Sequence, residues 1–370
     1  MHKYDINGDT WSIVTGMDDS RGNFFMGEAG GKIYAMGGLM NNSLNISNKT
    51  EEYDIASDIW TDRTIMPTPR FGGMSITIGN NIYTIGGIAE DDTMGGSLSV
   101  SGSVEVYNMD SDTWLSLEDM PSINSGSAFE ERAWVAFGAA QHVVIENNNY
   151  IYVVSGVSRI NVSSDSFAID DYNQRVLRYH VENDIWEYSS ILRSNELNTY
   201  QRIYPLTLVY DNKIIVFNGA IESGVNFIYP TDDFYVTIEN IFTSTSSGGE
   251  WINFGSGLLN GFPVVKFQSA MARYSSNPSV DYPAQYFIMG GRNNESSSLD
   301  LLENLIPTSN GFSYTNSYNN NTSVALTPLT IGRHGASAVY SDASGSPSIY
   351  LLGGYTIAQD STFVDIRFDI

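Results

Sequence analysis

The chain has 370 residues, of which 42 are acidic and only 18 are Lys or Arg, so its formal net charge is −24. So few cations cannot build the basic surface that nucleic acid or an anionic membrane requires, and we expect neither as a partner. The sequence has no cysteine, which excludes disulfides, thiolate nucleophiles and cysteine-ligated metals. It also has no apolar run of about 18 residues, so we expect no membrane insertion.

Short apolar segments that end in a pair of small residues recur along the whole chain. Each is rich in β-branched and aromatic residues and is halted by Gly, as expected of a buried strand that bends at its end. The six copies are KIYAMGG (32–38), NIYTIGG (81–87), YIYVVSG (150–156), KIIVFNG (213–219), QYFIMGG (285–291) and SIYLLGG (348–354). This repetition predicts one repeat architecture rather than several unrelated domains.

A Tyr followed seven residues later by a Trp is a second recurring element. The pairs are Tyr4 and Trp11, Tyr53 and Trp60, Tyr107 and Trp114, and Tyr179 and Trp186. The polar turn sequences DINGDT, DIASDI, NMDSDT and HVENDI lie between the two aromatic residues of each pair. Two strands joined by such a tight turn would place the paired aromatic rings close together between sheets.

The small-residue pair after an apolar strand, followed by Tyr and then Trp at a fixed step, resembles the kelch repeat. The resemblance extends over essentially the whole chain. It implies an all-β, six-bladed kelch-type β-propeller with four-stranded antiparallel blades in a single domain, 1–370. We place the blades approximately at 15–64, 65–118, 119–190, 191–255, 256–318, and 319–370 plus 1–14.

Both ends of the chain are expected to contribute to the last blade. Thr10–Val14 would supply its outer strand and the C-terminal region its other three, so that an N-terminal strand closes the ring. However, Tyr4–Ile6 and Phe368–Ile370 both resemble the end of a third strand. The sequence leaves open which of the two segments occupies that place.

One face of the propeller is expected to carry the function. The turns between third and fourth strands are short and uniform, whereas the connections between second and third strands vary in length and composition. These variable connections lie at 39–50, 88–103, 157–173, 220–232 and 292–298. Binding residues concentrate on variable loops held by a rigid scaffold, so we expect the variable-loop face to be the working one.

A cation precedes the first strand of every predicted blade. These residues are Arg21, Arg70, Arg132, Arg202, Lys266 and Arg333, and we predict that they bind ligand around the mouth of the channel. Guanidinium groups suit carboxylate, sulfate or phosphate oxygens. A structural interpretation stays open, because the same arginines can pair with carboxylates of their own or a neighbouring blade. Glu52 and Glu105 are the candidate partners.

The residues give catalysis less support. Copper-radical oxidases of kelch architecture need a cysteine cross-linked to tyrosine, so the resemblance excludes that activity for this cysteine-free chain. An enzyme that interconverts anomers of an acidic sugar is the alternative, with His334 beside Arg333 transferring protons. Otherwise no catalytic residue is predicted. The four histidines share no ligand spacing and the acidic pairs suit solvated loops, so we predict no metal and no cofactor.

We therefore predict a recognition module that binds an acidic glycan, peptide or protein through the variable-loop face and the central Arg/Lys ring. A mutarotase- or isomerase-like enzyme acting on an acidic sugar is one alternative, and a structural scaffold of a larger assembly or virion is another. The Asn-, Ser- and Gly-rich loops and the absence of cysteine favour an extracellular, cell-surface or virion location.

Overall fold

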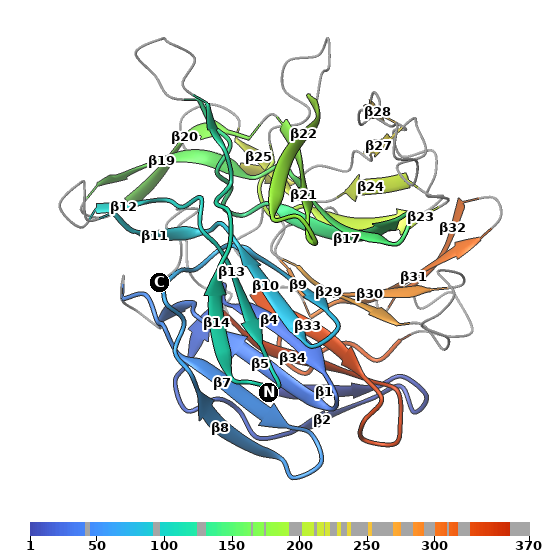
Figure 1. The fold of residues 1–370 in the computed structure, drawn as a ribbon. Helices are drawn as coiled ribbons and strands as arrows, with labels where there is room; N and C mark the ends of the chain where they lie inside the picture. Colours follow the sequence, from blue (N-terminus) through green and yellow to red (C-terminus); the bar gives the residue numbers. More distant parts are fainter. Residues whose placement is uncertain are drawn as a thin grey trace.

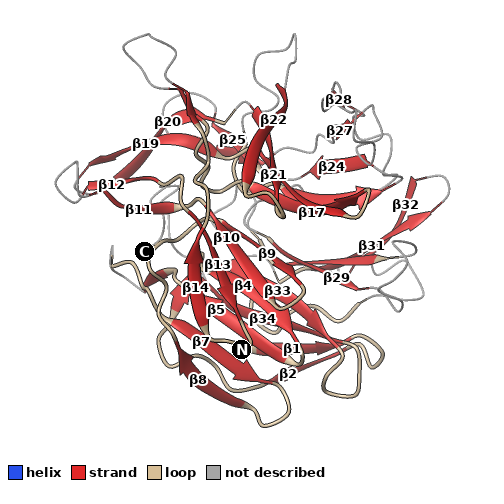
Figure 2. Ribbon diagram, viewed as in Figure 1, coloured by secondary structure: helices blue, strands red, loops and turns tan. Residues whose placement is uncertain are grey.

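The computed structural model of the protein is built of β-strands. It describes residues 1–40, 45–91, 97–123, 131–163, 166–173, 175–191, 202–210, 213–217, 219–222, 228–230, 235–237, 251–253, 269–274, 284–291, 300–308, 311–316 and 326–355. Figures 1 and 2 show strands and loops throughout this part of the chain. No helix within it is long and apolar enough to cross a membrane. The predicted all-β class is confirmed.

The described strands include six four-stranded antiparallel sheets, here called blades 1 to 6. Blade 1 contains β4 (Phe25–Ala29), β5 (Lys32–Met36), β7 (Thr50–Asp54) and β8 (Ile59–Arg63). Blade 2 contains β9 (Met74–Ile78), β10 (Asn81–Ile85), β13 (Val104–Asn108) and β14 (Thr113–Ser116). Blade 3 contains β17 (Ala139–Ile145), β18 (Asn148–Val154), β21 (Arg175–His180) and β22 (Ile185–Ile191).

Blades 4 to 6 follow the same order of strands. Blade 4 contains β23 (Leu206–Tyr210), β24 (Lys213–Phe217), β27 (Tyr235–Thr237) and β28 (Trp251–Asn253). Blade 5 contains β29 (Ala270–Tyr274), β30 (Gln285–Met289), β31 (Leu302–Thr308) and β32 (Gly311–Asn316). Blade 6 contains β33 (His334–Ser341), β34 (Ser348–Tyr355), β1 (His2–Asp5) and β2 (Thr10–Ile13).

Blade 6 is assembled from both ends of the described chain. Strand β1 pairs with β34, with Tyr4 opposite Ile349, and β2 pairs with the outer edge of β1. The N-terminal region therefore supplies the third strand as well as the outer one, so the expected division of three C-terminal strands and one N-terminal strand is wrong. The third strand is β1, whose end overlaps Tyr4–Ile6, while Phe368–Ile370 lies outside the described residues.

The backbone turns left-handed at the small-residue pair that ends a second strand, a conformation that glycine adopts without strain. In blade 2, Gly86 and Gly87 have φ values of 60° and 101°. A Cβ at Gly86 would lie 2.1 Å from the carbonyl oxygen of Val135 in the segment leading to blade 3. The glycine thus permits both the turn and the close approach of the next blade's backbone.

Apolar side chains fill the space between successive blades. The Tyr and Trp rings of each predicted pair lie 5.0 to 5.2 Å apart, so their predicted proximity is confirmed. Separate buried clusters join blades 1 and 2, 2 and 3, 3 and 4, 4 and 5, 5 and 6, and 6 and 1. The last of these brings Tyr350 and Leu352 of blade 6 against Ile33 and Tyr53 of blade 1.

Candidate functional site

Small β-ribbons occupy the variable-loop face. The connections between second and third strands contain β6 (Leu39–Met40), β11 (Ile88–Asp91) with β12 (Ser97–Val100), β19 (Val157–Ser163) with β20 (Ser166–Tyr172), and β25 (Ala220–Glu222) with β26 (Ile228–Pro230). Figure 1 shows the β11–β12 and β19–β20 ribbons side by side, and β12 contacts β19. The connection at 292–298 lies outside the described residues.

A buried apolar cluster supports these ribbons. It combines ribbon residues such as Ile88 and Val157 with residues of the segments that lead into the first strands, such as Phe71 and Phe137. The Phe137 ring lies 6.2 Å from the Phe71 ring and 4.8 Å from the Tyr204 ring, centroid to centroid. Because the ribbons rest on a packed base, their backbones are held in fixed positions over the blades.

Main-chain hydrogen bonds link these lead-in segments from blade to blade. The N–H of Gly72 donates to Asn23, that of Phe137 to Gly72, and that of Tyr204 to Phe137, each at 2.7 Å. The N–H of Asn23 donates to Gly335 at 3.4 Å. All five residues have positive φ, between 51° and 67°. This shared conformation marks equivalent positions in blades 6, 1, 2, 3 and 4, independently of the insertions between them.

The residue two positions before each left-handed residue, here called the ring position, includes four of the predicted cations. These are Arg21, Arg70, Arg202 and Arg333. In blade 3 the same position is Val135, whose carbonyl oxygen accepts the N–H of Gly87 just as that of Arg70 accepts the N–H of Gly38. The assignment of Arg132 to this position was therefore wrong, because Arg132 lies five residues before Phe137 rather than two. Arg132 lies instead in β16 (Glu131–Arg132), which pairs with β15 (Ser122–Ile123).

Arg70 is fully buried and bonded within blade 2. It donates to the carboxylate of Glu105 at 2.8 Å, to the hydroxyl of Thr84 at 2.9 Å, and to two backbone carbonyl oxygens. Its exposure is 0%, and its guanidinium also lies over the Phe25 ring of blade 1 at 5.2 Å. Burial lowers the pKa of Arg70, and Glu105 opposes that shift. The guanidinium joins strands and blades rather than facing solvent.

Arg21 has the equivalent arrangement in blade 1. It pairs with Glu51 at 2.5 Å, and its exposure is 3%. It also donates to the carbonyl oxygen of Ala35 at 3.1 Å. The expected partner Glu105 is thus found for Arg70, whereas the expected partner Glu52 is not the one that Arg21 uses. Glu52 instead binds Lys32, Tyr34 and Arg63.

Both carboxylates occupy one repeat position on the third strand, two residues before the repeat tyrosine. We call it the opposing position; it is Glu51 in blade 1 and Glu105 in blade 2. In blade 3 it is Leu177, which packs with Val135 in one buried cluster. Blade 3 therefore replaces the ion pair by two apolar side chains. Asn173 compensates for the missing guanidinium donor by donating to the carbonyl oxygen of Ser155 at 3.2 Å.

The other predicted site residues differ in their surroundings. Arg202 is 1% exposed, and Lys266 lies outside the described residues. Arg333 is only half-buried; it donates to the carbonyl oxygen of Gly353 and to Nδ1 of His2, both at 3.0 Å. His334, the residue of the enzyme alternative, is 2% exposed at the start of β33. A substrate would have to reach a buried imidazole there.

On the opposite face, an aspartate in the turn between the repeat Tyr and Trp accepts the main hydrogen bonds. The sequence analysis did not identify this residue. In blade 2, Asp112 accepts the Tyr107 hydroxyl at 2.7 Å and the backbone N–H of Thr64, just after blade 1, at 2.8 Å. The indole N–H of Trp114 donates to the carbonyl oxygen of the same Thr64 at 2.9 Å. Burial and the bond to Asp112 raise the pKa of Tyr107. We call this arrangement the Tyr-Asp-Trp latch.

The latch recurs at three more blade junctions. The aspartates are Asp9, Asp58 and Asp184, and they hold Thr327, Thr15 and Glu118 of the preceding segments. In each case the repeat tyrosine donates to the aspartate at 2.6 or 2.7 Å. Every latch aspartate has positive φ, between 47° and 58°. The uniform turns are therefore interblade ties, and no potential metal-binding group of three or more residues occurs in the described chain.

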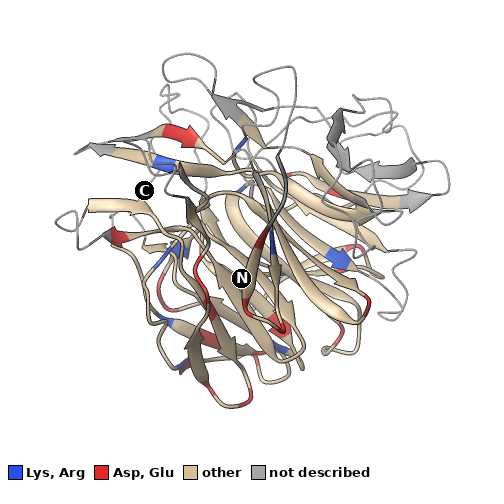
Figure 3. Ribbon diagram, turned by 45° about the horizontal axis from the view of Figure 1, so that its top comes forward, with Lys and Arg blue, Asp and Glu red and all other residues tan. Residues whose placement is uncertain are grey.

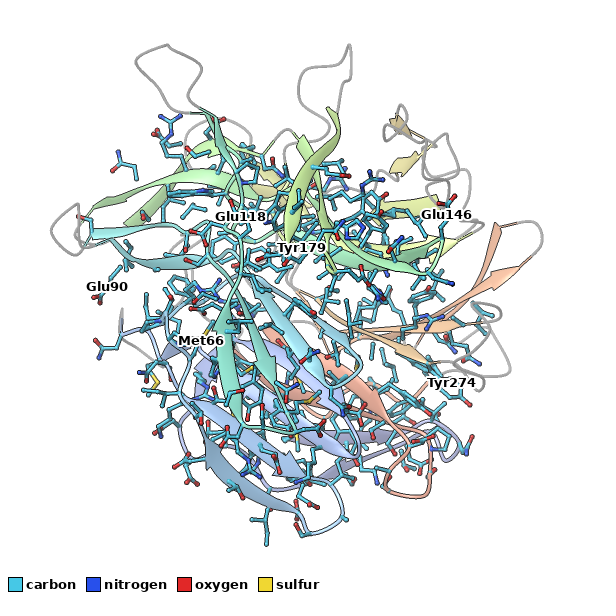
Figure 4. All side chains as sticks on the ribbon, in the orientation of Figure 1. Met66, Glu90, Glu118, Glu146, Tyr179 and Tyr274 are labelled. Carbon is cyan, nitrogen blue, oxygen red and sulfur yellow. The ribbon has the colours of Figure 1, made fainter. Side chains whose placement is uncertain are left out.

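Charged and polar side chains project from the ribbon face. Arg159 on β19 lies 3.7 Å from Asp170 and 3.6 Å from Asp171 on β20, and all three are about half exposed. Figure 3 shows how few Lys and Arg residues accompany the acidic ones. In Figure 4, Glu90 on β11 lies at the margin of the molecule, while Tyr179 lies among interior side chains. The ribbons thus present a polar surface over an apolar base.

The comparisons with known proteins agree with this architecture. A model of the Kelch motif matches residues 20–67 and 69–121, which include blades 1 and 2. The solved structure of YjhT is similar over 94% of each chain, with a TM-score of 0.62 and 16% identity, which bears on the fold alone.

A curated relative adds a match in sequence. The "Kelch repeat and BTB domain-containing protein 2" of Ectromelia virus (strain Moscow) is 30% identical over 155 residues. The match covers 40% of this chain and 25% of the relative, so the chain spans about a quarter of the relative's length. Together with the repeat geometry and the two motif matches, it supports the description of the fold as an all-β β-propeller with kelch repeats.

Proposed function

We propose that the six blades close into one ring and that this propeller is a binding module for a protein partner. Kelch propellers generally mediate protein–protein interaction. Closure is supported by the cluster that joins blade 6 to blade 1 and by the pairing of β1 with β34. A closed ring of interlocked blades would give the ribbon face a rigid base from which to recognise a partner.

The difference between the two faces carries the proposal. Four junctions on the turn face repeat the same latch, whereas the ribbons on the other face differ in length and sequence. Repetition is what a structural tie requires, and variation over a packed base is what selective recognition requires. The described ribbons β11–β12, β19–β20 and β25–β26 are two-stranded sheets, and a partner strand can add backbone hydrogen bonds at the edge of such a sheet.

The predicted ring of cations contributes less to ligand binding in this proposal than the sequence suggested. Arg21 and Arg70 are occupied by their own carboxylates, so an anionic peptide or glycan would have to displace a buried ion pair to reach either. Arg333 is half-buried and is the better candidate for contact with an anionic group. Binding of an acidic ligand thus depends on blade 6 more than on the ring as a whole.

Site-specific photo-crosslinking tests the choice of face. A benzophenone amino acid at Glu90, on ribbon β11, would be compared with the same group at Ser111, in the exposed turn of the same blade. We expect partner adducts, identified by mass spectrometry from the native source, to form from position 90 and not from position 111. Equal yields from both positions, or adducts from position 111 alone, would overturn the assignment to the ribbon face.

A separate measurement addresses the enzyme alternative. NMR exchange spectroscopy on uronic and other acidic sugars would detect catalysed interconversion of anomers. The binding proposal expects no acceleration above the rate in buffer. An acceleration that His334→Gln abolished would replace the binding proposal by catalysis at blade 6.

A further inference from the structure

Blade 6 departs from the pattern that blades 1 to 3 show at the ring and opposing positions. Blades 1 and 2 place Arg against Glu, and blade 3 places Val against Leu. In blade 6 the ring position is Arg333, and the opposing position, two residues before Tyr4, is His2. The register supports this equivalence, because His2 lies opposite Leu351 as Glu105 lies opposite Thr84, each two residues before the small-residue pair.

The hydrogen bonds of His2 define its charge. Arg333 donates to Nδ1 of His2 at 3.0 Å, so this nitrogen must carry a lone pair. The proton of the neutral ring is then on Nε2, which lies 3.3 Å from the Thr330 hydroxyl. Burial, Arg333 and the N-terminal ammonium lower the pKa of His2 to about 4. At neutral pH, His2 therefore adds no negative charge opposite Arg333.

Arg333 consequently differs from Arg21 and Arg70 in charge balance. Among the residues that the structure describes, no carboxylate lies within ion-pair distance of its guanidinium, whereas Arg21 and Arg70 have carboxylates at 2.5 and 2.8 Å. Its Nε atom is buried and has no hydrogen-bond partner, as is also true of Arg21 and Arg70, so the difference lies in the missing carboxylate alone. Burial lowers the pKa of Arg333, and no carboxylate among the described residues opposes that shift. A partly buried charge without a counter-ion is costly, and an anion that reaches it is correspondingly favoured.

We propose that Arg333 in blade 6 binds the carboxylate of a ligand, which supplies the negative charge that Glu51 and Glu105 supply in blades 1 and 2. A carboxylate suits the planar donor fork of a guanidinium, which the neighbouring blades use in this way. Arg333 is partly exposed, unlike Arg21 and Arg70, so the group can approach from solvent. This inference deepens the proposed function, since it selects the member of the ring that recognises an acidic group.

Side-chain NMR of the arginine Nε–H groups tests the inference with acetate as the probe. We expect acetate to shift the Arg333 signal along a saturable curve up to about 1 M, the range suited to one weak ion pair in water. Sodium chloride at the same ionic strength should leave it in place. The Arg21 and Arg70 signals of the same sample are internal controls and should not move. An Arg333 signal that ignores acetate, or moves equally with chloride, would overturn the inference.

The variant His2→Glu provides the decisive comparison. It installs in blade 6 the carboxylate that blades 1 and 2 already have, so it should abolish the acetate response and raise the melting temperature. The variant Arg333→Gln should also abolish the response but should not raise the melting temperature. An acetate response that persists in His2→Glu would refute the site, while leaving the cross-linking test of the ribbon face unaffected.

Discussion

Blades 2 and 3 solve the same packing problem with opposite chemistry. At the ring and opposing positions, blade 2 buries Arg70 against Glu105, and blade 3 buries Val135 against Leu177. Both pairs lie between the segment that leads into the blade and the third strand, and all four residues are no more than 2% exposed. The difference shows that the ring and opposing positions must be filled by packed side chains and that any charge there must be paired. It also shows that charge is not required.

Each solution has consequences for the groups around it. In blade 2 the guanidinium donates to the carbonyl oxygen of Gly86, and in blade 3 the side chain of Asn173 donates to the equivalent carbonyl oxygen of Ser155. The backbone N–H groups of Ser101 and Asn173 make equivalent bonds, to Gly87 and Gly156, so these two residues occupy the same repeat position. In blade 3, Asn173 therefore replaces the arginine as the hydrogen-bond donor to this carbonyl oxygen, because a buried carbonyl oxygen without a donor is unfavourable.

The largest effect is expected when one half of the blade 2 pair is removed. Glu105→Ala would leave Arg70 buried without its carboxylate, and breaking a buried ion pair from one side costs about 3–5 kcal/mol. The free energy of unfolding from urea denaturation measures this loss. Glu90→Ala, which removes an exposed carboxylate of the same blade, should change stability by less than about 0.5 kcal/mol. A loss below about 1 kcal/mol for Glu105→Ala would mean that the pair is not a structural unit.

A smaller effect is expected from the latch, which all the compared blades share. Asp112→Ala removes the acceptor for Tyr107 and for the backbone N–H of Thr64, and it places alanine at a φ of 52°. We expect a loss of about 1–3 kcal/mol, because a donor is left without a partner and the backbone is strained. Asp112→Asn keeps one acceptor and a residue that tolerates this φ, so it should lose less. Equal losses for the two variants would contradict the hydrogen-bond explanation.

The sequence predicted the regularly repeated features of the blades better than the positions at which one blade departs from the repeat. The spacing of Tyr107 and Trp114 was sufficient to place two strands and their turn, since fixed spacing reports fixed geometry. The same reasoning misplaced Arg132, because the longer β17–β18 hairpin changes the distance to the small-residue pair, and only the left-handed φ of Phe137 identifies Val135. His2 was missed because its role requires the pairing of β1 with β34, a contact between residues more than 300 apart in the chain.

The charge balance of blade 6 predicts a dependence of stability on pH. The pKa of His2 is about 4 in the folded protein and returns towards its ordinary value of 6.5 on unfolding. Between these values the unfolded chain binds a proton that the folded chain does not. The contribution of His2 to the free energy of unfolding is therefore fully present above pH 6.5, and it is lost as the pH is lowered towards 4. The contribution is about 1 kcal/mol after allowance for solvent screening of this partly exposed side chain.

The variant His2→Gln isolates this contribution from those of other titrating groups. The difference in unfolding free energy between wild type and variant should change between pH 7 and pH 4, with the wild type losing more. The groups that face His2 are Arg333, the N-terminal ammonium and the Thr330 hydroxyl. A difference that is constant over this range would show that His2 titrates normally in the folded protein.

The smallest effect should come from transferring the whole blade 3 arrangement into blade 2. The triple variant Arg70→Val, Glu105→Leu and Ser101→Asn replaces the ion pair by an apolar pair and restores a donor for Gly86. Substitution of a buried ion pair by packed apolar residues is often neutral, so we expect a change within about 1 kcal/mol in urea unfolding, despite the loss of two charges. The double variant without Ser101→Asn should be less stable than the triple, because the Gly86 carbonyl oxygen then loses its side-chain donor. If the triple variant were as unstable as Glu105→Ala, the ion pair itself would be required in blade 2, and the two blades would not be interchangeable solutions.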